Sequence, residues 1–315
     1  MGSVSLVTGG AGFIGSHLTE ALAAQGERVR VLDNFSTGQR SNLSSIRPVP
    51  EIIEGDVADP DAVARSLRDV QTVYHLAAIA SVQKSLEDPL ATHRGCATGT
   101  LTVLDAARRA GIRRFVYAAS ASAYGIPAGE VQVESDPVSP LSPYGAGKLA
   151  GELYARAFAA AYGMETVCLR FFNVFGPRQR ADSPYSGVIA LFIAAMLAGR
   201  RPRILGDGRQ TRDFVFVDDV VQALTKAART NKVQGSIYNV GTGRGVDLLE
   251  LVAVLNRVLE TRLEPEFGPS RAGDIRHSRA NIARIRNDLG YEPQVSFEEG
   301  LRRTVAWCQT SACTS

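Results

Sequence analysis

The chain has 315 residues, a net charge of +3 and an apolar fraction of 45%. This length can bury one large core or two modest ones, and so small a charge gives no reason to expect a nucleic-acid partner. The longest apolar stretch, residues 188–198, is too short to span a bilayer, and the four cysteines have neither metal-binding nor redox-pair spacing. Because a strand-like run begins at Val4, we expect no secretory signal, and we predict a cytoplasmic protein without a metal site or a membrane partner.

Short β-rich runs alternate with helical patterns through the first half of the chain. The expected strands are residues 4–8, 28–32, 51–54, 72–76, 115–119 and 166–170, and the expected helices are residues 13–25, 59–69, 88–110 and 145–162. Strands joined by helical crossovers of this length form parallel sheets with helices on both faces. The pattern therefore predicts an α/β fold with a doubly wound, Rossmann-type parallel sheet, which binds ligands at the carboxyl ends of its strands.

The alternation of strand and helix patterns ends after Asn173, where loops rich in glycine, proline and arginine begin. We expect a smaller C-terminal α/β lobe here, with helices near residues 247–260, 279–288 and 296–309. Residues 238–240 resemble one more buried strand, so we expect the chain to return to the first sheet. The predicted division is a nucleotide-binding domain of residues 1–173 with a returning segment near 214–242, and a substrate lobe of residues 174–213 and 243–310.

Gly9, Gly12 and Gly15 follow the first expected strand and open the first expected helix. In that context the first glycine permits a tight turn, the second lets the backbone approach a pyrophosphate, and the third lets helix and strand pack closely. A plain strand-to-helix turn is the simpler alternative, but Asp33 at the end of the second strand supports a dinucleotide site. A carboxylate there accepts hydrogen bonds from an adenosine ribose and repels a 2′-phosphate, which favours NAD over NADP.

Two further strands end in candidate cofactor residues. Asp56 follows the third strand and is a candidate for the adenine edge, with a helix cap for the segment near Asp59 as the alternative. His75 ends the fourth strand, and the small residues Ala77 and Ala78 after it let a cofactor approach the backbone. We expect His75 itself to be a packed, hydrogen-bonded histidine rather than a catalyst.

Tyr144 and Lys148 stand four residues apart, just after Ser142 and Pro143. Serine caps helices well and proline suits the first helical position, so the tyrosine and the lysine are expected one turn apart on the same helix face. A phenol titrates near pH ~10 and becomes a useful base near neutrality only beside a cation. The spacing alone is common at amphipathic helix starts, but beside the glycine motif it predicts nicotinamide redox chemistry.

Together these motifs resemble the extended short-chain dehydrogenase/reductase family, and in particular its sugar-nucleotide 4-epimerases. The resemblance extends from about Ser5 to Trp307 and rests on residues 8–15, 33–38, 55–57, 75–78, 120–125, 144–148, 170–173, 212–213 and 271–274. It implies that Tyr144 takes the proton of the sugar's 4-hydroxyl and that Ser120 hydrogen-bonds the reacting oxygen. It also implies that Lys148 holds the nicotinamide ribose and lowers the pKa of the phenol.

The resemblance further implies two ligands, NAD and a UDP-sugar, and the residues that hold them. The implied NAD site comprises Gly9, Gly12, Phe13, Ile14, Gly15, Asp33, Asn34, Ser36, Gly38, Asp56, Val57, Leu76, Ala77, Ala78, Tyr144, Lys148 and Phe171. The implied UDP-sugar site comprises Ser81, Val82, Ser120, Ser122, Tyr144, Asn173, Gly187, Val188, Arg212, Arg271, Asp274 and Ser278. In it the diphosphate is expected at Asn173, Arg212 and Arg271, the uridine ribose near Asp274, and the uracil near Gly187 and Val188. For each arginine taken alone, a surface salt bridge is the alternative.

Ser120, Ala121 and Ser122 bear on the choice of reaction. Dehydratases of the family resemble Thr-Asp-Glu here, because elimination needs a separate acid and base, and UDP-glucuronate decarboxylases resemble Thr-Ser-Glu. With neither carboxyl present, the remaining route is oxidation at C4, rotation of the keto sugar and return of the hydride to its other face, which is 4-epimerisation. Ser278 stands where glucose-restricted relatives resemble a bulky tyrosine, so we predict activity on UDP-GlcNAc/UDP-GalNAc as well as UDP-glucose/UDP-galactose. One departure from the family is Gly147, where many relatives carry serine.

Three other functions remain open at the level of sequence. A UDP-glucuronate 4-epimerase would use Arg178 or Arg180 to meet the carboxylate of the sugar. A sugar-nucleotide 4-ketoreductase would consume external NAD(P)H, and a non-catalytic NAD-sensing regulator would not need Ser120, Tyr144 and Lys148 together. Relatives commonly dimerise through two helices per subunit, here near residues 90–110 and 145–162, so the resemblance also implies a homodimer.

Overall fold

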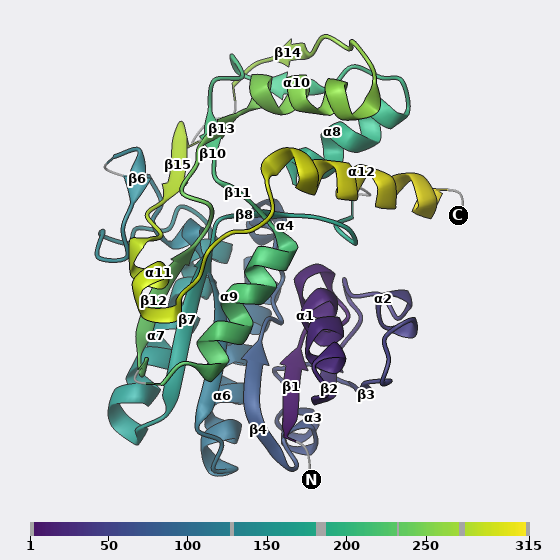
Figure 1. Ribbon diagram of the computed structural model, residues 1–315. Helices are drawn as coiled ribbons and strands as arrows, with labels where there is room; N and C mark the ends of the chain where they lie inside the picture. Colours follow the sequence, from purple (N-terminus) through teal and green to yellow (C-terminus); the bar gives the residue numbers. More distant parts are fainter. Residues whose placement is uncertain (1–2, 127–128, 181–186, 232, 271–274, 313–315) are drawn as a thin grey trace.

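The structure, a computed structural model, describes residues 3–126, 129–180, 187–231, 233–270 and 275–312. Its centre is a seven-stranded parallel sheet in the order β12-β7-β5-β4-β1-β2-β3 (Figure 1). Its strands are β1 (Val4–Thr8), β2 (Arg28–Asp33), β3 (Glu51–Glu54), β4 (Val70–His75), β5 (Arg114–Ser120), β7 (Glu165–Phe171) and β12 (Ser236–Val240). The strand order runs outward in opposite directions from β1 and β4, which is where doubly wound sheets bind their ligands. The predicted doubly wound fold is confirmed.

Helices cover both faces of this sheet. On one face α1 packs beside α9, and on the other α3, α6 and α7 pack side by side. The helices of these two layers and their neighbours are α1 (Phe13–Ala24), α2 (Ser41–Ser44), α3 (Pro60–Ser66), α4 (Val82–Glu87), α5 (Pro89–His93), α6 (Gly99–Arg109), α7 (Pro143–Tyr162), α9 (Val217–Arg229) and α11 (Ala283–Leu289). Each layer buries apolar side chains against the sheet, as Leu18 and Val220 do on the first face and Leu104 and Ala155 do on the second.

A smaller lobe lies beyond the carboxyl ends of the strands, at the top of Figure 1. It contains a four-stranded sheet in the order β13-β10-β15-β6, two strand pairs and three helices around a core of its own. Its elements and the strands that lead into it are β6 (Val131–Gln132), β8 (Asn173–Phe175), β9 (Arg203–Leu205), β10 (Thr211–Arg212), β11 (Phe214–Phe216), β13 (Val246–Asp247), β14 (Glu266–Gly268), β15 (His277–Ala280), α8 (Val188–Leu197), α10 (Leu248–Leu259) and α12 (Phe297–Ala312). In the part of the chain that the structure describes, no helix is both long enough and apolar enough to cross a membrane.

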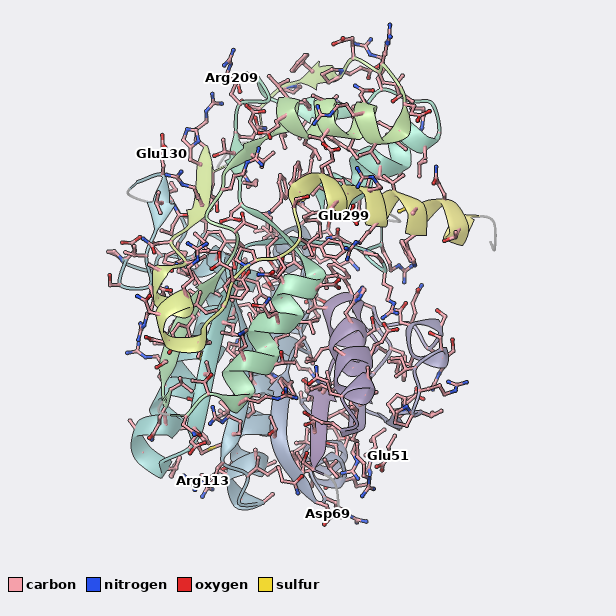
Figure 2. The ribbon with its side chains drawn as sticks, in the orientation of Figure 1. Glu51, Asp69, Arg113, Glu130, Arg209 and Glu299 are labelled. Carbon is pink, nitrogen blue, oxygen red and sulfur yellow. The ribbon has the colours of Figure 1, made fainter. Side chains whose placement is uncertain are left out.

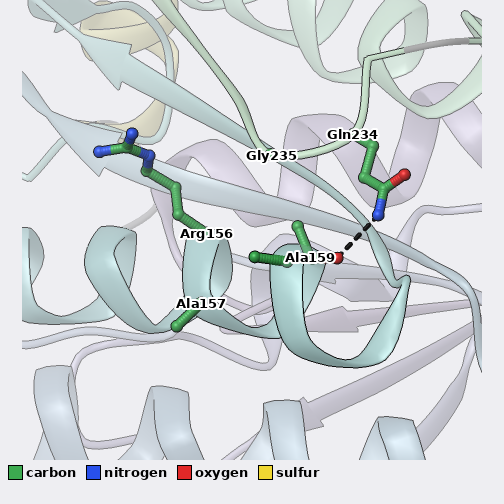
Figure 3. Close-up of a pocket in the computed structure, with 6 residues that line it drawn as sticks. Arg156, Ala157, Ala159, Gln234 and Gly235 are labelled. Atoms are coloured by element: carbon green, nitrogen blue, oxygen red, sulfur yellow. Dashed lines mark hydrogen bonds between the residues drawn. The ribbon is translucent and has the colours of Figure 1, made fainter.

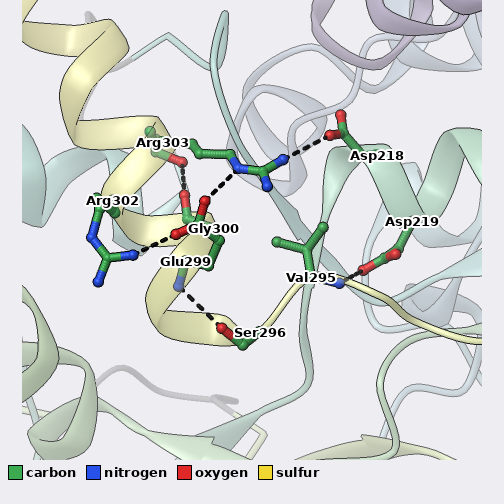
Figure 4. Close-up of polar contacts among 9 residues, drawn as sticks. Asp218, Asp219, Val295, Ser296, Glu299, Gly300, Arg302 and Arg303 are labelled. Atoms are coloured by element: carbon green, nitrogen blue, oxygen red, sulfur yellow. Dashed lines mark hydrogen bonds and ion pairs between the residues drawn. The ribbon is translucent and has the colours of Figure 1, made fainter.

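Polar contacts tie α12 of the smaller lobe to α9 on the sheet (Figure 4). Arg303 lies 3.4 Å from Asp218 in the first turn of α9. Asp219, its neighbour, is almost fully buried and accepts a hydrogen bond from Val295 N at 3.3 Å, just before α12. The two lobes therefore share anchored elements as well as chain connections.

The strand expected at residues 238–240 is present and pairs with β7, so the chain returns to the first sheet. The helical segment expected at residues 88–110 is present: α5, a π-helical turn (Arg94–Thr98) and α6 follow one another without a break. Gly99 after the turn packs so closely that a Cβ on it would lie 2.6 Å from Val57. One other expectation was wrong. The helix expected from residue 279 starts only at Ala283, because residues 277–280 form β15 between β10 and β6.

Candidate functional site

The turn between β1 and α1 has room for a ligand because it carries no bulky side chains. Gly9 has a φ of +69°, and a Cβ on it would lie 2.8 Å from Ala77 N. A Cβ on Gly15 would lie 2.1 Å from Gly9 O, so helix and turn meet more closely than any side chain allows. Gly12 precedes α1 and provides no side-chain cap. The free N–H groups of the first helical turn therefore offer a site for an anion such as a pyrophosphate.

Asp33, at the end of β2, has its carboxylate fixed against this glycine turn. Its Oδ2 accepts a hydrogen bond from Ala11 N at 2.9 Å, and its Oδ1 accepts one from Phe35 N at 2.8 Å. Gly38 comes so close that a Cβ on it would lie 2.9 Å from Asp33 Oδ1. Each carboxylate oxygen can accept a further hydrogen bond, so the geometry suits a ribose diol.

Asp56 lies beside this loop and shapes the turn after β3. Its Oδ2 accepts a hydrogen bond from Asn34 Nδ2 at 2.9 Å and its Oδ1 one from Ala58 N at 2.8 Å, whereas Asp59 is the residue that caps α3. The cap proposed as the alternative role of Asp56 is thus supplied by Asp59. The remaining cofactor candidates lie at the same edge: Phe13 and Ile14 in the first turn of α1, Ser36 after β2, Val57 after β3, Leu76 and Ala78 after β4, and Phe171 at the end of β7.

His75 is fully buried and holds the ends of β1 and β4 together. Its Nδ1 lies 2.7 Å from Thr8 Oγ1, and its Nε2 lies 3.0 Å from Thr100 Oγ1 on α6. Thr8 Oγ1 also accepts hydrogen bonds from Leu76 N and Ala77 N, both at 3.2 Å. Burial, with a smaller contribution from the charge of Lys148, lowers the pKa of His75 to about 3. A neutral histidine in these contacts is a structural residue, as the sequence predicted.

Tyr144 lies in the first turn of α7, which begins as the sequence predicted. Ser142 caps the helix by accepting a hydrogen bond from Gly145 N at 3.1 Å, with Pro143 in the first position. A side-chain hydrogen bond joins Tyr144 to Ser120 at the end of β5. Ser120 Oγ accepts a hydrogen bond from Ser122 Oγ at 2.8 Å, so its own proton is left for the phenol oxygen. The structure thus brings the two serines and the tyrosine together.

Lys148 follows Tyr144 on the same face of α7 and is 3% exposed. Its Nζ lies 4.4 Å from the centroid of the Tyr117 ring, a cation–π contact. Burial lowers the pKa of Lys148 to about 8. Burial also raises the pKa of Tyr144 to about 12, against a smaller lowering by the Ser120 hydrogen bond. In the protein residues alone the lowering comes from Ser120, and a lowering of the phenol's pKa by Lys148 stays a prediction.

Three candidate substrate residues converge where the smaller lobe meets the sheet. Asn173 N donates to Asp213 O at 3.0 Å, and Asp213 N donates to Ser278 O at 2.9 Å. Arg212, the residue before Asp213, is paired with Ser278 in the parallel strands β10 and β15. Chain segments that are far apart in sequence thus place Asn173, Arg212 and Ser278 around one backbone junction.

The other substrate candidates lie at helix starts or outside the described residues. Ser81 caps α4 and accepts a hydrogen bond from Lys84 N, with Val82 as the first helical residue. Gly187 and Val188 begin α8, and a Cβ on Gly187 would lie 3.1 Å from Gln179 Nε2. Arg271 and Asp274 lie outside the residues that the structure describes.

Arg178 was a candidate for meeting a uronic-acid carboxylate, but the structure gives it a protein partner. Its Nη2 lies 2.6 Å from Glu20 Oε2 on α1, and its Nη1 donates to Ser16 Oγ at 3.4 Å. His17 on the same helix has its Nε2 2.9 Å from Pro177 O. These contacts hold the loop after β8 against α1 and engage the Arg178 guanidinium with Glu20 and Ser16.

The sequence analysis assigned no role to three buried polar residues next to these candidates. Asp213 is fully buried and accepts hydrogen bonds from Thr242 Oγ1 at 2.7 Å and Ala280 N at 3.0 Å. Glu152 and Arg170 form an ion pair with 2% and 3% of their side chains exposed. Glu152 and Arg170 each had a sequence signal, because Glu152 continues the four-residue spacing of Tyr144 and Lys148, and Arg170 interrupts an apolar strand.

A shallow hollow of about 470 Å³ lies on the outer half of α7 (Figure 3). It is lined by Arg156, Ala157, Ala159, Ala160, Gln234 and Gly235. Gln234 Nε2 donates to Ala159 O at 2.7 Å across it. At 1.5 Å of rise per residue, Arg156 and the three alanines lie roughly 18 Å or more along α7 from Tyr144. The hollow is open and, at this distance from Tyr144, is separate from the candidate site.

Comparison with known proteins gives consistent results along the whole chain. A family model described as the NAD dependent epimerase/dehydratase family matches residues 5–241. The UDP-glucose 4-epimerase of Mycolicibacterium smegmatis is 41% identical over 305 residues, covering 96% of this chain and 97% of that protein. The solved structure of a UDP-N-acetylglucosamine 4-epimerase from Methanobrevibacter ruminantium, in complex with UDP-N-acetylmuramic acid, has a TM-score of 0.94 at 37% identity, covering 99% of this chain and 100% of that one. The Thermotoga maritima UDP-glucose 4-epimerase with UDP-glucose has a TM-score of 0.93 at 36% identity, covering 98% and 99%.

Proposed function

The chain belongs to the NAD-dependent epimerase/dehydratase family, and we propose that within this family it is a UDP-sugar 4-epimerase. We infer that it interconverts UDP-GlcNAc with UDP-GalNAc and UDP-glucose with UDP-galactose. The observation that carries this proposal is the Ser120–Tyr144 hydrogen bond beside Lys148, with alanine and serine at positions 121 and 122. Elimination of water needs a further acid and base, and these two positions supply neither.

The residues at the edge of the sheet fit NAD. The glycine turn would hold the pyrophosphate at the start of α1, and Asp33 would accept the hydroxyls of the adenosine ribose. When bound, oxidised NAD supplies a hydride acceptor that returns the same hydride, together with a positively charged ring. Because the hydride is returned in each turnover, no external reductant is needed.

The protein residues move one proton and hold the sugar. We propose that Tyr144, as phenolate, takes the proton of the 4-hydroxyl and gives it back once the ring has turned. Ser120 donates a hydrogen bond to the same sugar oxygen, and its orientation is set by Ser122. Lys148 binds the nicotinamide ribose, and its positive charge favours the phenolate.

The substrate contacts are also a proposal. Asn173 and Arg212 lie at the junction of sheet and smaller lobe, where a guanidinium supplies charge and paired donors for a diphosphate. Arg271 and Asp274 are proposed for the diphosphate and the uridine ribose, and Gly187 with Val188 at the start of α8 for the uracil. Ser278 lies next to Arg212, and its small side chain leaves space beside C2 of the sugar for an N-acetyl group.

A panel of UDP-sugars tests the proposed reaction. The purified protein, with no added cofactor, is incubated with UDP-GlcNAc, UDP-glucose or UDP-glucuronate, and the products are followed by proton NMR. We expect UDP-GlcNAc and UDP-glucose to be interconverted with their 4-epimers. When the substrate carries deuterium at C4, we expect the product to retain it. Turnover only after NAD(P)H is added, with its stoichiometric consumption, would identify a ketoreductase instead, and exclusive turnover of UDP-glucuronate would identify the uronic-acid epimerase. Bound NAD with no turnover of any sugar would support a regulator.

We also propose a homodimer, a cytoplasmic location and the division into domains given by the sequence. Leu86 of α4, Leu90 of α5 and Leu153 of α7 are 56%, 80% and 51% exposed, and these helices pack against one another. Apolar side chains gathered on adjacent helices suit a contact between two copies. Sedimentation analysis of wild type and Leu90→Asp tests this contact. The proposed domains are residues 1–173 with the segment near 214–242, and the lobe of residues 174–213 and 243–310. Within the last range, α11 packs against β12 and α9 of the large sheet.

A further inference from the structure

We propose that the buried Glu152–Arg170 ion pair is a positioning device that fixes the rotation of α7, so that Tyr144 and Lys148 face Ser120. This inference rests on the proposed function, because it takes Tyr144 as the base. Glu152 and Arg170 touch neither ligand in this account. They act through the helix that carries the reacting groups.

The geometry of α7 places the ion pair in line with the reacting groups. Tyr144, Lys148 and Glu152 are spaced four residues apart, so they lie along one face of the helix over two turns. Arg170, on β7, donates from Nε to Glu152 Oε2 at 2.8 Å and from Nη2 to Glu152 Oε1 at 2.7 Å. Two parallel hydrogen bonds between planar groups fix both distance and orientation. The helix is thereby prevented from turning about its axis or sliding over the sheet.

The same guanidinium also holds the segment that follows Ser120. The Arg170 guanidinium carbon lies 4.6 Å from the centroid of the Tyr124 ring, and Tyr124 is almost fully buried. Tyr124 comes directly after the short helical turn of residues 121–123, and its hydroxyl donates to Asn239 Oδ1 at 2.7 Å. The Arg170 guanidinium therefore contacts both segments that carry the reacting groups. Through Glu152 it contacts α7, which carries Tyr144, and through Tyr124 it contacts the segment that follows Ser120.

The contacts continue from Asn239 to the strand that carries Ser278. Asn239 Nδ2 donates to Gln132 O at 2.9 Å, and Gln132 Oε1 accepts from Arg279 N at 2.9 Å. Arg279 follows Ser278 in β15. The buried network thus runs from the catalytic helix to the strand proposed to contact the sugar, and it fixes their relative positions.

Energetics favour a positional role over a stabilising one. Taking two charges out of water costs several kcal/mol per ion, so a buried pair often contributes little net stability compared with apolar residues of the same volume. The effect of the pair on rate can be much larger than its effect on stability, because a displacement of about 1 Å at the reacting atoms can cost on the order of a hundredfold in rate. The position of this pair, one turn beyond Lys148, is where such a constraint acts on the chemistry.

The test compares Glu152→Gln with a control at the other end of β7, the strand that carries Arg170. Glu165 begins β7 and pairs with Arg114 of β5 at 2.9 Å, with Arg113 beside them. Figure 2 shows Arg113 at the end of the molecule opposite the smaller lobe. Glu165→Gln therefore breaks an ion pair that joins β7 to β5, far from the reacting groups.

The readouts are kcat, KM and the rate at which bound nicotinamide is reduced when UDP-glucose is added. This reduction is followed by the absorbance at 340 nm. We expect Glu152→Gln to slow this reduction by about tenfold or more, with little change in KM, because the reacting groups are misplaced. We expect Glu165→Gln to leave the reduction rate near that of wild type. Amide hydrogen exchange without substrate is expected to rise in the first turns of α7 only in Glu152→Gln. A reduction rate for Glu152→Gln equal to that of the control overturns the inference.

Two further variants keep the outcome decisive. If Glu152→Gln does not fold, the double variant Glu152→Met, Arg170→Met removes both buried charges and is expected to fold. It should still reduce nicotinamide slowly, and a wild-type rate in the folded double variant overturns the inference. Tyr144→Phe is run in parallel: if it keeps the wild-type rate, the proposed base is wrong, whereas slow Tyr144→Phe with fast Glu152→Gln refutes only the positioning role.

Discussion

Burial shifts the two proposed reacting groups in opposite directions. It raises the pKa of Tyr144 to about 12 and lowers the pKa of Lys148 to about 8. At neutral pH the phenol is therefore protonated and the ammonium still charged. Ser120 opposes the first shift by hydrogen bonding to the phenol, but protein residues alone do not produce a phenolate. A bound cationic ring next to the phenol would act in the required direction.

Lys148 gives the protein a specific dependence of stability on pH. A lysine whose folded pKa lies below its unfolded value binds fewer protons in the folded state between those two values, so stability increases with pH there. We expect the free energy of unfolding of wild type, relative to Lys148→Met, to rise by about 2 kcal/mol from pH ~8 to pH ~9.5. Urea unfolding of nucleotide-free protein measures the difference. A constant difference across this range would show that the ammonium is well solvated.

Ser278 determines the size of the accepted sugar if it lies beside C2. Tyrosine at this position would fill the space available to an N-acetyl group, so we expect Ser278→Tyr to reduce kcat/KM for UDP-GlcNAc and UDP-GalNAc by about 10- to 200-fold. Activity on UDP-glucose and UDP-galactose should remain within a few fold. Ser278→Ala is the control and should keep both activities. NMR assays of the N-acetylated pair and of the glucose/galactose pair test this role of Ser278. Equal losses of activity on the two pairs would rule out a selective contact.

At the scale of elements, α7 depends on how closely it approaches its neighbours. A Cβ on Gly147 would lie 2.9 Å from the Cβ of Cys96, in the π-helical turn between α5 and α6. In an exposed helix, glycine to alanine stabilises by roughly 1 kcal/mol. Here we expect Gly147→Ala to destabilise by about 1–3 kcal/mol, because the two helical segments must move apart.

The double variant Gly147→Ala, Cys96→Gly is the control for this prediction. It removes the opposing Cβ, so the combined cost should be smaller than the sum of the two single costs. Urea unfolding of the four proteins measures this coupling. A stabilised Gly147→Ala would mean that the helices have room to spare.

The elements that sequence could predict are those specified locally. The start of α7 follows from Ser142 and Pro143, and the glycine turn follows from its own spacing. In contrast, β15 exists because residues 277–280 find partners in β10 and β6, which are distant in the sequence. A helical pattern near residue 279 therefore failed to predict a strand. The same reason hid the Glu152–Arg170 pair, since neither residue shows its partner in its own neighbourhood.

At the scale of the whole molecule, Asp213 joins the substrate lobe to the sheet. Its carboxylate accepts hydrogen bonds from Thr242 N at 2.8 Å, Thr242 Oγ1 at 2.7 Å, Gly243 N at 2.9 Å and Ala280 N at 3.0 Å. Thr242 and Gly243 follow β12 of the large sheet, while Ala280 ends β15 of the small one. Its own backbone contacts Asn173 and Ser278. A single buried carboxylate thus sets the distance between the residues proposed to hold the diphosphate and the sugar of the substrate.

We expect Asp213→Asn to weaken substrate binding more than the chemical step. An amide has one acceptor oxygen, so some of the four donors lose their partner, at about 1–3 kcal/mol for each group left unsatisfied. The junction around Asn173, Arg212 and Ser278 should then loosen, which raises KM for UDP-glucose while the reduction rate of bound nicotinamide at saturation changes less. Asp219→Asn is the matched control, because this buried carboxylate also accepts backbone N–H groups, those of Gln294 and Val295, but between α9 and α12 (Figure 4). Both variants should lower the urea midpoint, and only Asp213→Asn should raise KM. A similar KM in the two variants would mean that general loosening of the lobes, and not the Asp213 junction, controls substrate affinity.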